Sequence, residues 1–106
     1  MLGAMTVPHE PELADVPLTA VMQALSDEVR LCIVRELAAG GEAVCGTLEL
    51  DVSKATRSHH FRVLREAGIT RTRLDGTRRY VSLRAGDLDE RFPGLLDAVL
   101  AVPSGA

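Results

Sequence analysis

The 106-residue sequence contains few aromatic residues and no tryptophan. Phe61, Tyr80 and Phe92 make up its whole aromatic content, so a core has to be built mainly from Leu, Val, Ile and Ala, as is usual in helical domains. A hydrophobic content of 46% is enough for one small core in a chain of this length. The composition therefore predicts a single, mainly helical domain.

Long apolar runs are also missing. No stretch approaches the roughly 20 apolar residues that a membrane-spanning helix needs, and the first residues lack the basic and apolar regions of a signal peptide. Two cysteines, Cys32 and Cys45, are too few for a disulfide scaffold and fit a reducing compartment. We expect a cytoplasmic protein with no membrane partner.

Catalytic motifs are absent too. The sequence shows no nucleophile–base pair, no metal-hydrolase spacing and no glycine-rich phosphate loop. The pair Gly40-Gly41 follows a helical pattern and is typical of a helix end, not of a loop that opens a helix. We therefore predict that the protein is not an enzyme.

Charge is present but sharply segregated. Residues 1–53 carry nine acidic and two basic side chains, whereas residues 54–84 carry nine basic and two acidic ones. The overall charge of −3 hides this contrast, and it says little about binding partners when one segment is so basic. The basic segment indicates a surface for a polyanion.

Hydrophobic periodicity predicts a mainly α-helical chain with a small β-hairpin. The predicted order is a helix at 18–25, a helix that Ser26 or Asp27 caps and Gly40-Gly41 ends, a short helix within 43–50, a helix from Ser53 to about Ala67, a hairpin turning at Asp75-Gly76, and a helix from near Pro93. Residues 1–16 are predicted to be a flexible acidic arm, 17–101 the folded domain, and 102–106 a disordered tail.

A short helix, a tight connection and a longer capped helix form a helix-turn-helix, and the hairpin makes it a winged one. On a helical wheel, Phe61, Leu64 and Ala67 share the packing side of the longer helix, while Ala55, Ser58, His59 and Arg62 share the other. Small and polar side chains allow close approach to base edges in a major groove, and long cations nearby reach phosphates. A solvated basic face is the alternative for the helix alone, and docking on an acidic protein partner is the alternative for the whole domain.

The stretches "ALSDEVRLCIVRELAAGGEAVC", "VSKATRSHHFRVLREAGI" and "DGTRRYVSL" resemble the ArsR/SmtB family of winged helix-turn-helix repressors. The resemblance covers residues 24–83 and implies a homodimer on an inverted-repeat operator of double-stranded DNA, paired through its first and last helices. The sequence departs from the family at Arg57, where the family has an apolar residue. We expect the aliphatic stem of Arg57 to lie in apolar surroundings and its charged group to reach the surface.

The sequence and the resemblance together give three groups of candidate residues. Base-reading residues implied by the resemblance are Lys54, Ala55, Thr56, Ser58 and His59. Candidates for phosphate contact are Arg57, Arg62, Arg65, Arg71, Arg73, Arg78 and Arg79. Candidates for the dimer interface are Leu18, Val21, Met22, Leu25, Leu95, Leu96, Val99 and Leu100.

Many members of the family that the sequence resembles respond to a metal, which binds a cysteine pair at the start of the third helix or Asp and His on the last helix. Here Cys45 stands alone and the last helix has no histidine, so neither pattern carries over. Adjacent helical residues point about 100° apart, so His59 and His60 cannot form an i, i+4 pair. The weak metal candidates, which would suit Ni²⁺ or Zn²⁺, are His9, Glu10, Glu12 and Asp15. We expect packing roles for both cysteines, and regulation by a separate partner protein is the other possibility.

Overall fold

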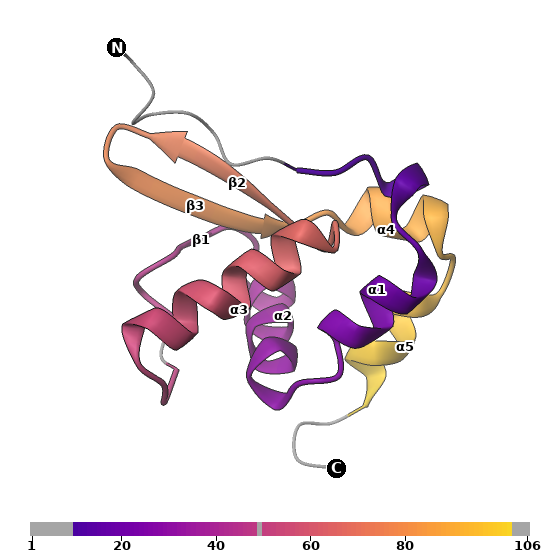
Figure 1. The fold of residues 1–106 in the computed structure, drawn as a ribbon, viewed down its shortest axis with the longest axis horizontal. Helices are drawn as coiled ribbons and strands as arrows, with labels where there is room; N and C mark the ends of the chain where they lie inside the picture. Colours follow the sequence, from indigo (N-terminus) through magenta and orange to yellow (C-terminus); the bar gives the residue numbers. More distant parts are fainter. Residues whose placement is uncertain (1–9, 49, 103–106) are drawn as a thin grey trace.

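A computed structural model describes residues 10–48 and 50–102 of the chain. Its elements, in order, are η2 (Leu13–Asp15), α1 (Leu18–Ala24), α2 (Glu28–Gly40), β1 (Ala43–Val44), α3 (Lys54–Glu66), β2 (Thr70–Asp75), β3 (Arg78–Leu83), α4 (Ala85–Arg91) and α5 (Leu95–Ala101). Figure 1 shows the β2–β3 hairpin at one end of the molecule, α1, α4 and α5 at the other, and α3 running between them in front of α2. No helix in the described residues is both long and apolar enough to cross a membrane. The predicted combination of helices and one hairpin is confirmed.

Side-chain caps fix the starts of the two longest helices. The Asp27 carboxylate accepts hydrogen bonds from the backbone N–H groups of Val29 and Arg30, at 2.8 and 3.1 Å. The Ser53 hydroxyl accepts one from the Thr56 N–H at 3.2 Å. Both caps satisfy donors that have no partner within the helix. The predicted start of α3 is confirmed, and Asp27, not Ser26, caps α2.

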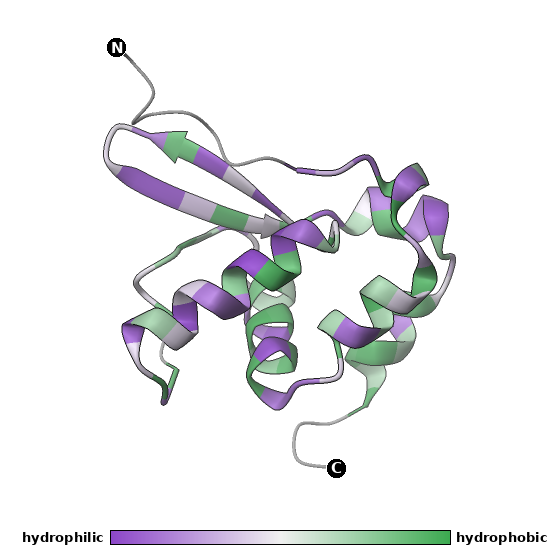
Figure 2. Ribbon diagram, in the orientation of Figure 1, coloured by the Kyte–Doolittle hydropathy of each residue, from purple (hydrophilic) through white to green (hydrophobic). Residues whose placement is uncertain are grey.

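The core lies where α2, α3 and the sheet meet. Ile33 of α2, Leu64 of α3 and Ile69 after it are completely inaccessible, and Val81 of β3 is 2% exposed. Figure 2 shows hydrophobic residues concentrated on α1, α2 and α5, whereas α3 and the hairpin carry more hydrophilic ones. Burial of aliphatic surface thus places the polar helix α3 on the outside of an apolar support.

The sheet has the strand order β1-β3-β2, with antiparallel pairs throughout. Gly76 turns the hairpin with a φ of 63°, a conformation that glycine adopts without strain. Cross-strand partners share a face, so the pair Thr72 and Val81 and the pair Leu74 and Arg79 lie on one side of the hairpin. Thr72 and Val81 are buried, which identifies this side as the one facing the body of the domain.

The predicted short helix within residues 43–50 is wrong. Ala43 and Val44 form β1 and pair with Val81 and Tyr80, and the Cys45 N–H donates to the Arg79 carbonyl at 2.9 Å. Residues 45–47 then form a turn. The backbone donors of this stretch are used by the sheet, so they are not available to a helix. The connection into α3 is therefore a strand and a turn in the described residues before it.

The C-terminal part contains a helix that the sequence pattern did not predict. Helix α4 occupies residues 85–91, and α5 starts at Leu95, two residues after the predicted start near Pro93. Pro93 disfavours a helical backbone at Phe92, the residue before it, and Gly94 has a φ of 83°. This Pro-Gly step divides the segment into two short helices.

A flexible arm was expected over residues 1–16, but residues 10–16, which the structure describes, are packed against the domain. Leu13 and Val16 are each only 5% exposed and belong to the core. Arg91 of α4 donates to the carbonyls of Leu13 and Val16, and Arg84 donates to that of Pro11. Residues 10–16 thus pack against α4, while residues 1–9 and the predicted tail at 103–106 lie outside the described residues.

Candidate nucleic-acid interface

One edge of α3 is open to solvent over the whole helix. Its exposed residues are Lys54, Ala55, Thr56, Ser58, His59, Arg62 and Glu66, and its buried ones are His60, Phe61 and Leu64. The structure therefore exposes all five residues for which base reading was predicted, and base reading itself stays a prediction. Among these seven exposed residues Glu66 is the single acid, and it lies at the C-terminal end.

Two contacts shape the chemistry of this edge. The Ser53 hydroxyl donates to the Thr56 hydroxyl at 2.9 Å, so Thr56 is partly occupied by the helix cap. The Nη2 atom of Arg62 lies 3.3 Å from the Nδ1 atom of His59. A guanidinium can only donate, so this contact makes Nδ1 the acceptor and leaves the proton of a neutral His59 on Nε2. His59 then offers a donor toward solvent.

Arg71 and Arg73 of β2 lie on the hairpin face opposite Thr72 and Val81 and are held by acidic residues. Arg73 donates to both carboxylate oxygens of Glu42, at 3.0 and 2.7 Å, and its guanidinium lies 4.4 Å from the centre of the Tyr80 ring. The hydrogen bond from Arg73 lowers the pKa of Glu42 despite the opposing effect of desolvation. Arg71 lies 3.1 Å from Asp87 and 3.7 Å from Glu10. Arg71 and Arg73 are therefore already paired with acids, and their contact with phosphate stays a prediction.

The remaining predicted phosphate contacts divide into two sets. Arg62, Arg78 and Arg79 are exposed, and no acid in the described ranges forms an ion pair with them. Arg57 and Arg65 are half-buried on the side of α3 that faces the sheet. Arg57 is only half-buried, but its Nε is buried, so its charged group does not reach the surface as fully as expected.

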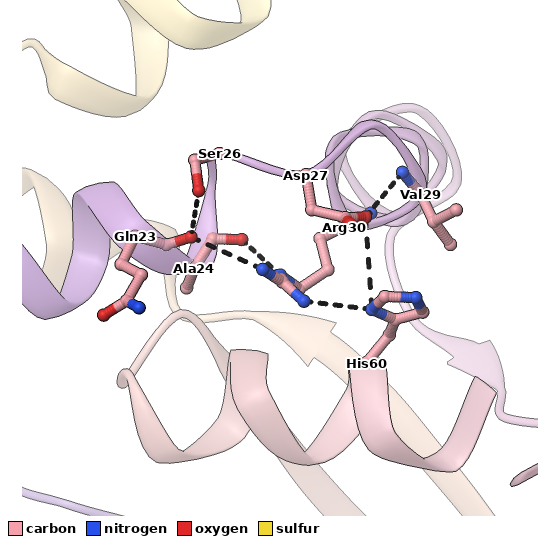
Figure 3. A network of polar contacts seen from close by, with 7 residues as sticks. All are labelled: Gln23, Ala24, Ser26, Asp27, Val29, Arg30 and His60. Carbon is pink, nitrogen blue, oxygen red and sulfur yellow. Dashed lines mark hydrogen bonds and ion pairs between the residues drawn. The ribbon is translucent and has the colours of Figure 1, made fainter. Parts of the chain in front are cut away.

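A network centred on Arg30 joins α2 to both α1 and α3 (Figure 3). Arg30 Nε donates to the Ala24 carbonyl at 2.6 Å, and Nη2 donates to that of Gln23 at 3.4 Å. Arg30 Nη1 lies 3.0 Å from Nδ1 of the buried His60, which must accept. The 4.0 Å approach of Asp27 to the same nitrogen is too long for a second bond. Arg30 was not among the residues predicted from the sequence, because its position three residues after an N-cap gives no signal of this role.

Asp27 belongs to the same network as well as capping α2. Desolvation by partial burial would raise the pKa of its carboxyl group. The backbone hydrogen bonds from Arg30 and Val29, together with the charge of Arg30, outweigh that effect and lower the pKa. The cap is therefore an ionised carboxylate over the neutral pH range.

Glu10, Glu12 and Asp15, the described metal candidates, do not form a metal site in the part of the chain that the structure describes. Within residues 10–48 and 50–102, no three His, Cys, Asp or Glu side chains lie close enough to hold an ion. Glu10 accepts a hydrogen bond from the Thr72 N–H at 2.6 Å, and His9 lies outside the described residues. Glu12 and Asp15 are exposed on either side of buried Leu13.

Both cysteines are free and half-buried. Cys45 packs against the core, as expected, but no helix begins there, so the thiolate stabilisation that such a helix start would give does not apply. Burial raises the pKa of the Cys45 thiol, and the charges of Arg79, Arg65 and Arg57 reduce that effect without reversing it. Cys45 is a neutral thiol at neutral pH.

The residues predicted for a dimer interface differ in accessibility. Leu18 and Met22 are 49% and 52% exposed on α1, and Val102 just after α5 is 50% exposed. The half-buried candidates are Leu25, Leu95, Leu96, Val99 and Leu100. Val21 is completely buried within the protomer, so it supports this face from inside and cannot touch a partner. Its burial corrects that assignment.

Comparison with known proteins agrees with this architecture. A helix-turn-helix domain family matches residues 25–73. The HTH-type transcriptional regulator YceK of Bacillus subtilis (strain 168) is 44% identical over 82 residues, which cover 74% of this chain and 82% of that protein. The arsenical resistance operon repressor of Staphylococcus aureus is 34% identical over 79 residues, 74% of this chain and 76% of its own length. A cadmium resistance transcriptional regulatory protein CadC homolog from Staphylococcus aureus is 42% identical over 65 residues, 59% of this chain and 54% of its own. The exposed basic helix, the hairpin beside it and these relatives show that the chain belongs to the ArsR/SmtB family of winged helix-turn-helix transcriptional regulators.

Proposed function

We propose that this regulator binds double-stranded DNA sequence-specifically, as a homodimer on an inverted repeat, with α3 in the major groove. The observation that carries the proposal is the exposed edge of α3, where small and polar side chains stand among cations. Ala55 permits close approach, and Ser58 and the Nε2 proton of His59 supply hydrogen bonds to base edges. Lys54 and Arg62 at the margins of the edge neutralise phosphates.

The tip of the hairpin provides the second contact. Arg78 and Arg79 are exposed and form no ion pair with the described acidic residues, so their charges are available to a phosphate backbone. Arg73 would first have to exchange its two hydrogen bonds with Glu42. We therefore assign the wing contact to Arg78 and Arg79.

Pairing of two protomers through α1 and α5 follows from the apolar surface there. Leu18, Met22 and Val102 leave about half of their surface exposed. The half-buried leucines of α5 continue this surface, since the helix has no buried residue in the single protomer. Association would bury this area and set the distance between the two α3 helices, which an inverted repeat has to match.

Selection of a preferred duplex from a random-sequence pool, followed by titration at several salt concentrations, tests the proposal. A specific regulator should prefer the selected inverted repeat over a scrambled duplex by at least about 10³-fold and lose affinity steeply with salt. Equal affinity for both duplexes would instead favour docking on an acidic protein partner. Repeating the titration with Ni²⁺ or Zn²⁺ examines a metal response.

Two variants separate base reading from phosphate contact. His59→Ala should weaken binding to the selected repeat more than to scrambled duplex, because His59 lies on the edge that faces the bases. Arg78→Ala combined with Arg79→Ala should weaken both about equally and reduce the salt slope by about 1 for each lost contact. Arg73→Gln is the matched control on the same hairpin, and we expect it to leave the salt slope unchanged. Equal losses for His59→Ala on both duplexes would contradict base reading.

A further inference from the structure

A cavity of about 350 Å³ lies between α3, the turn after β1 and the inner face of the hairpin. Ligand pockets commonly have volumes of about 300–1,000 Å³, so its size suits a small molecule. Phe61 and Val81 give it apolar walls, and Thr70 and Thr72 also line it. It lies beside the DNA-facing edge of α3, since Lys54 and Ser58 belong to both.

The charged lining of this cavity is entirely basic. Its cations are Lys54, Arg57, Arg65 and Arg79, and no acidic side chain is among the described residues that line it. Arg57, Phe61 and Arg65 follow one another at i, i+4 spacing, so they form one stripe along α3. Four positive charges in a lining that contains no acid among the described residues produce a positive local potential.

Two of these arginines also contain unused donors. The Nε atoms of Arg57 and Arg65 are buried, and neither finds a hydrogen-bond partner in the part of the chain that the structure describes. A buried donor without a partner is costly, and charged donors cost the most. The neighbouring Cys45 cannot compensate, because its thiol is neutral and a weak acceptor.

We propose that this cavity binds a small organic anion, in which one oxyanion group is carried on an apolar body. The oxyanion, a carboxylate or a phosphate monoester, accepts hydrogen bonds from Arg57 and Arg65 and is attracted by Arg79. The apolar body packs on Phe61 and Val81. A bare inorganic anion satisfies the guanidinium groups but leaves this apolar wall without a contact.

Occupation of the cavity would act on DNA binding, and this step rests on the proposed function. Lys54 and Ser58 line the cavity and also stand on the exposed edge of α3. A bound anion neutralises part of the charge that attracts phosphates and competes for Lys54. The ligand therefore lowers affinity for duplex DNA beyond the effect of ionic strength alone.

Titration of the ¹⁵N-labelled full chain by NMR, without DNA, tests the site. Phenyl phosphate serves as the probe, with inorganic phosphate and benzyl alcohol as its two halves, all at constant ionic strength. Phenyl phosphate should shift the amides of Cys45, Thr72 and Val81 saturably and bind at least tenfold more tightly than either half. Binding no tighter than inorganic phosphate, or shifts spread over the whole surface, would overturn the proposal.

Variants identify the donors. Arg57→Gln with Arg65→Gln should weaken phenyl phosphate at least tenfold, because each removes a charged hydrogen bond. Arg57→Lys with Arg65→Lys should retain more of the affinity, and a preserved amide spectrum shows that each variant is folded. Arg73→Gln, on the same hairpin but outside the cavity, is the matched control and should bind phenyl phosphate with native affinity. Affinity unchanged in the double Gln variant would refute the assignment.

The two proposals can fail separately. If phenyl phosphate binds at the cavity but no duplex is bound, the anion site stands and the DNA-binding proposal fails. Suppose instead that the native chain does not bind phenyl phosphate, and that the double Gln variant binds duplex DNA more weakly than the native chain does. The cavity then receives a DNA phosphate, and the small-molecule proposal is wrong. Lower duplex affinity with phenyl phosphate than with matched chloride would confirm that the two sites are linked.

Discussion

Gly68, two residues after the end of α3, offers a sharp test of how the N-terminal segment packs against this helix. Its φ is 78°, and a Cβ atom added to it would lie 2.5 Å from Leu13 Cδ2 and 3.2 Å from Leu13 Cγ. The Gly68→Ala substitution therefore introduces two costs. One is a left-handed backbone at a residue with a side chain, and the other is overlap with a buried leucine.

The magnitudes of these costs can be estimated separately. A left-handed conformation costs a non-glycine residue about 1–2 kcal/mol. Overpacking in a filled core adds about 1–3 kcal/mol. Gly94 is the matched control, because it has a left-handed backbone with a φ of 83° and nothing lies within 4 Å of its added Cβ. We expect Gly68→Ala to lower the free energy of unfolding by about 2–5 kcal/mol and Gly94→Ala by about 1–2 kcal/mol.

Chemical denaturation of both variants, each also made in a Leu13→Ala background, measures the two costs. Removing the Leu13 side chain eliminates the overlap, so Gly68→Ala should then cost no more than Gly94→Ala. The double-mutant cycle should give a coupling of about 1–3 kcal/mol between positions 13 and 68. Equal destabilisation by the two glycine variants, or zero coupling, would refute the packing of residues 10–16 on this end of α3.

Three further predictions concern the caps and the dimer. Ser53→Ala should destabilise the protein by about 1 kcal/mol, and Ser53→Gly by less, in the same denaturation assay. The pKa of Asp27 is lowered from its ordinary value of 3.8, so its contribution to stability is complete above that value and is lost as the pH falls through the lower folded-state pKa. Between pH 2 and 6, the free energy of unfolding of Asp27→Asn should therefore depend less steeply on pH than that of the native protein. An unchanged pH dependence would contradict the ionised cap. Leu18→Lys with Met22→Lys should give a folded monomer in sedimentation experiments, and a persistent dimer would place the interface elsewhere.

The sequence predicted those elements whose signals are local. The caps at Asp27 and Ser53 and the Asp75-Gly76 turn depend on neighbouring residues, and all three occur in the structure. The predicted short helix within residues 43–50 was wrong because residues 43–44 pair with β3, which lies nearly forty residues later in the chain. Local propensity carries no information about such a pairing. Helix α4 was missed because its seven residues show little periodicity.

The candidate site shows the same limit. Helical spacing alone identified which residues of α3 are exposed, because solvent access follows the period of the helix. It did not separate Arg71 and Arg73 from Arg78 and Arg79, because the acids that hold the first pair come from distant segments. Glu42 follows α2, and Asp87 belongs to the unpredicted α4. Ion pairs of this kind become visible only in three dimensions.

The orientation of α3 relative to the exposed apolar face depends on a small number of polar contacts. Arg30 connects the carbonyls at the end of α1, the helix that carries Leu18 and Met22, with His60 on the buried side of α3. His59 is the next residue along that helix and points to solvent. A hydrogen-bonded guanidinium between two helices fixes their distance more narrowly than aliphatic packing does, because its donors have defined directions. In a dimer formed through α1, the separation of the two exposed α3 edges therefore depends on Arg30 as directly as on the apolar residues that make the contact.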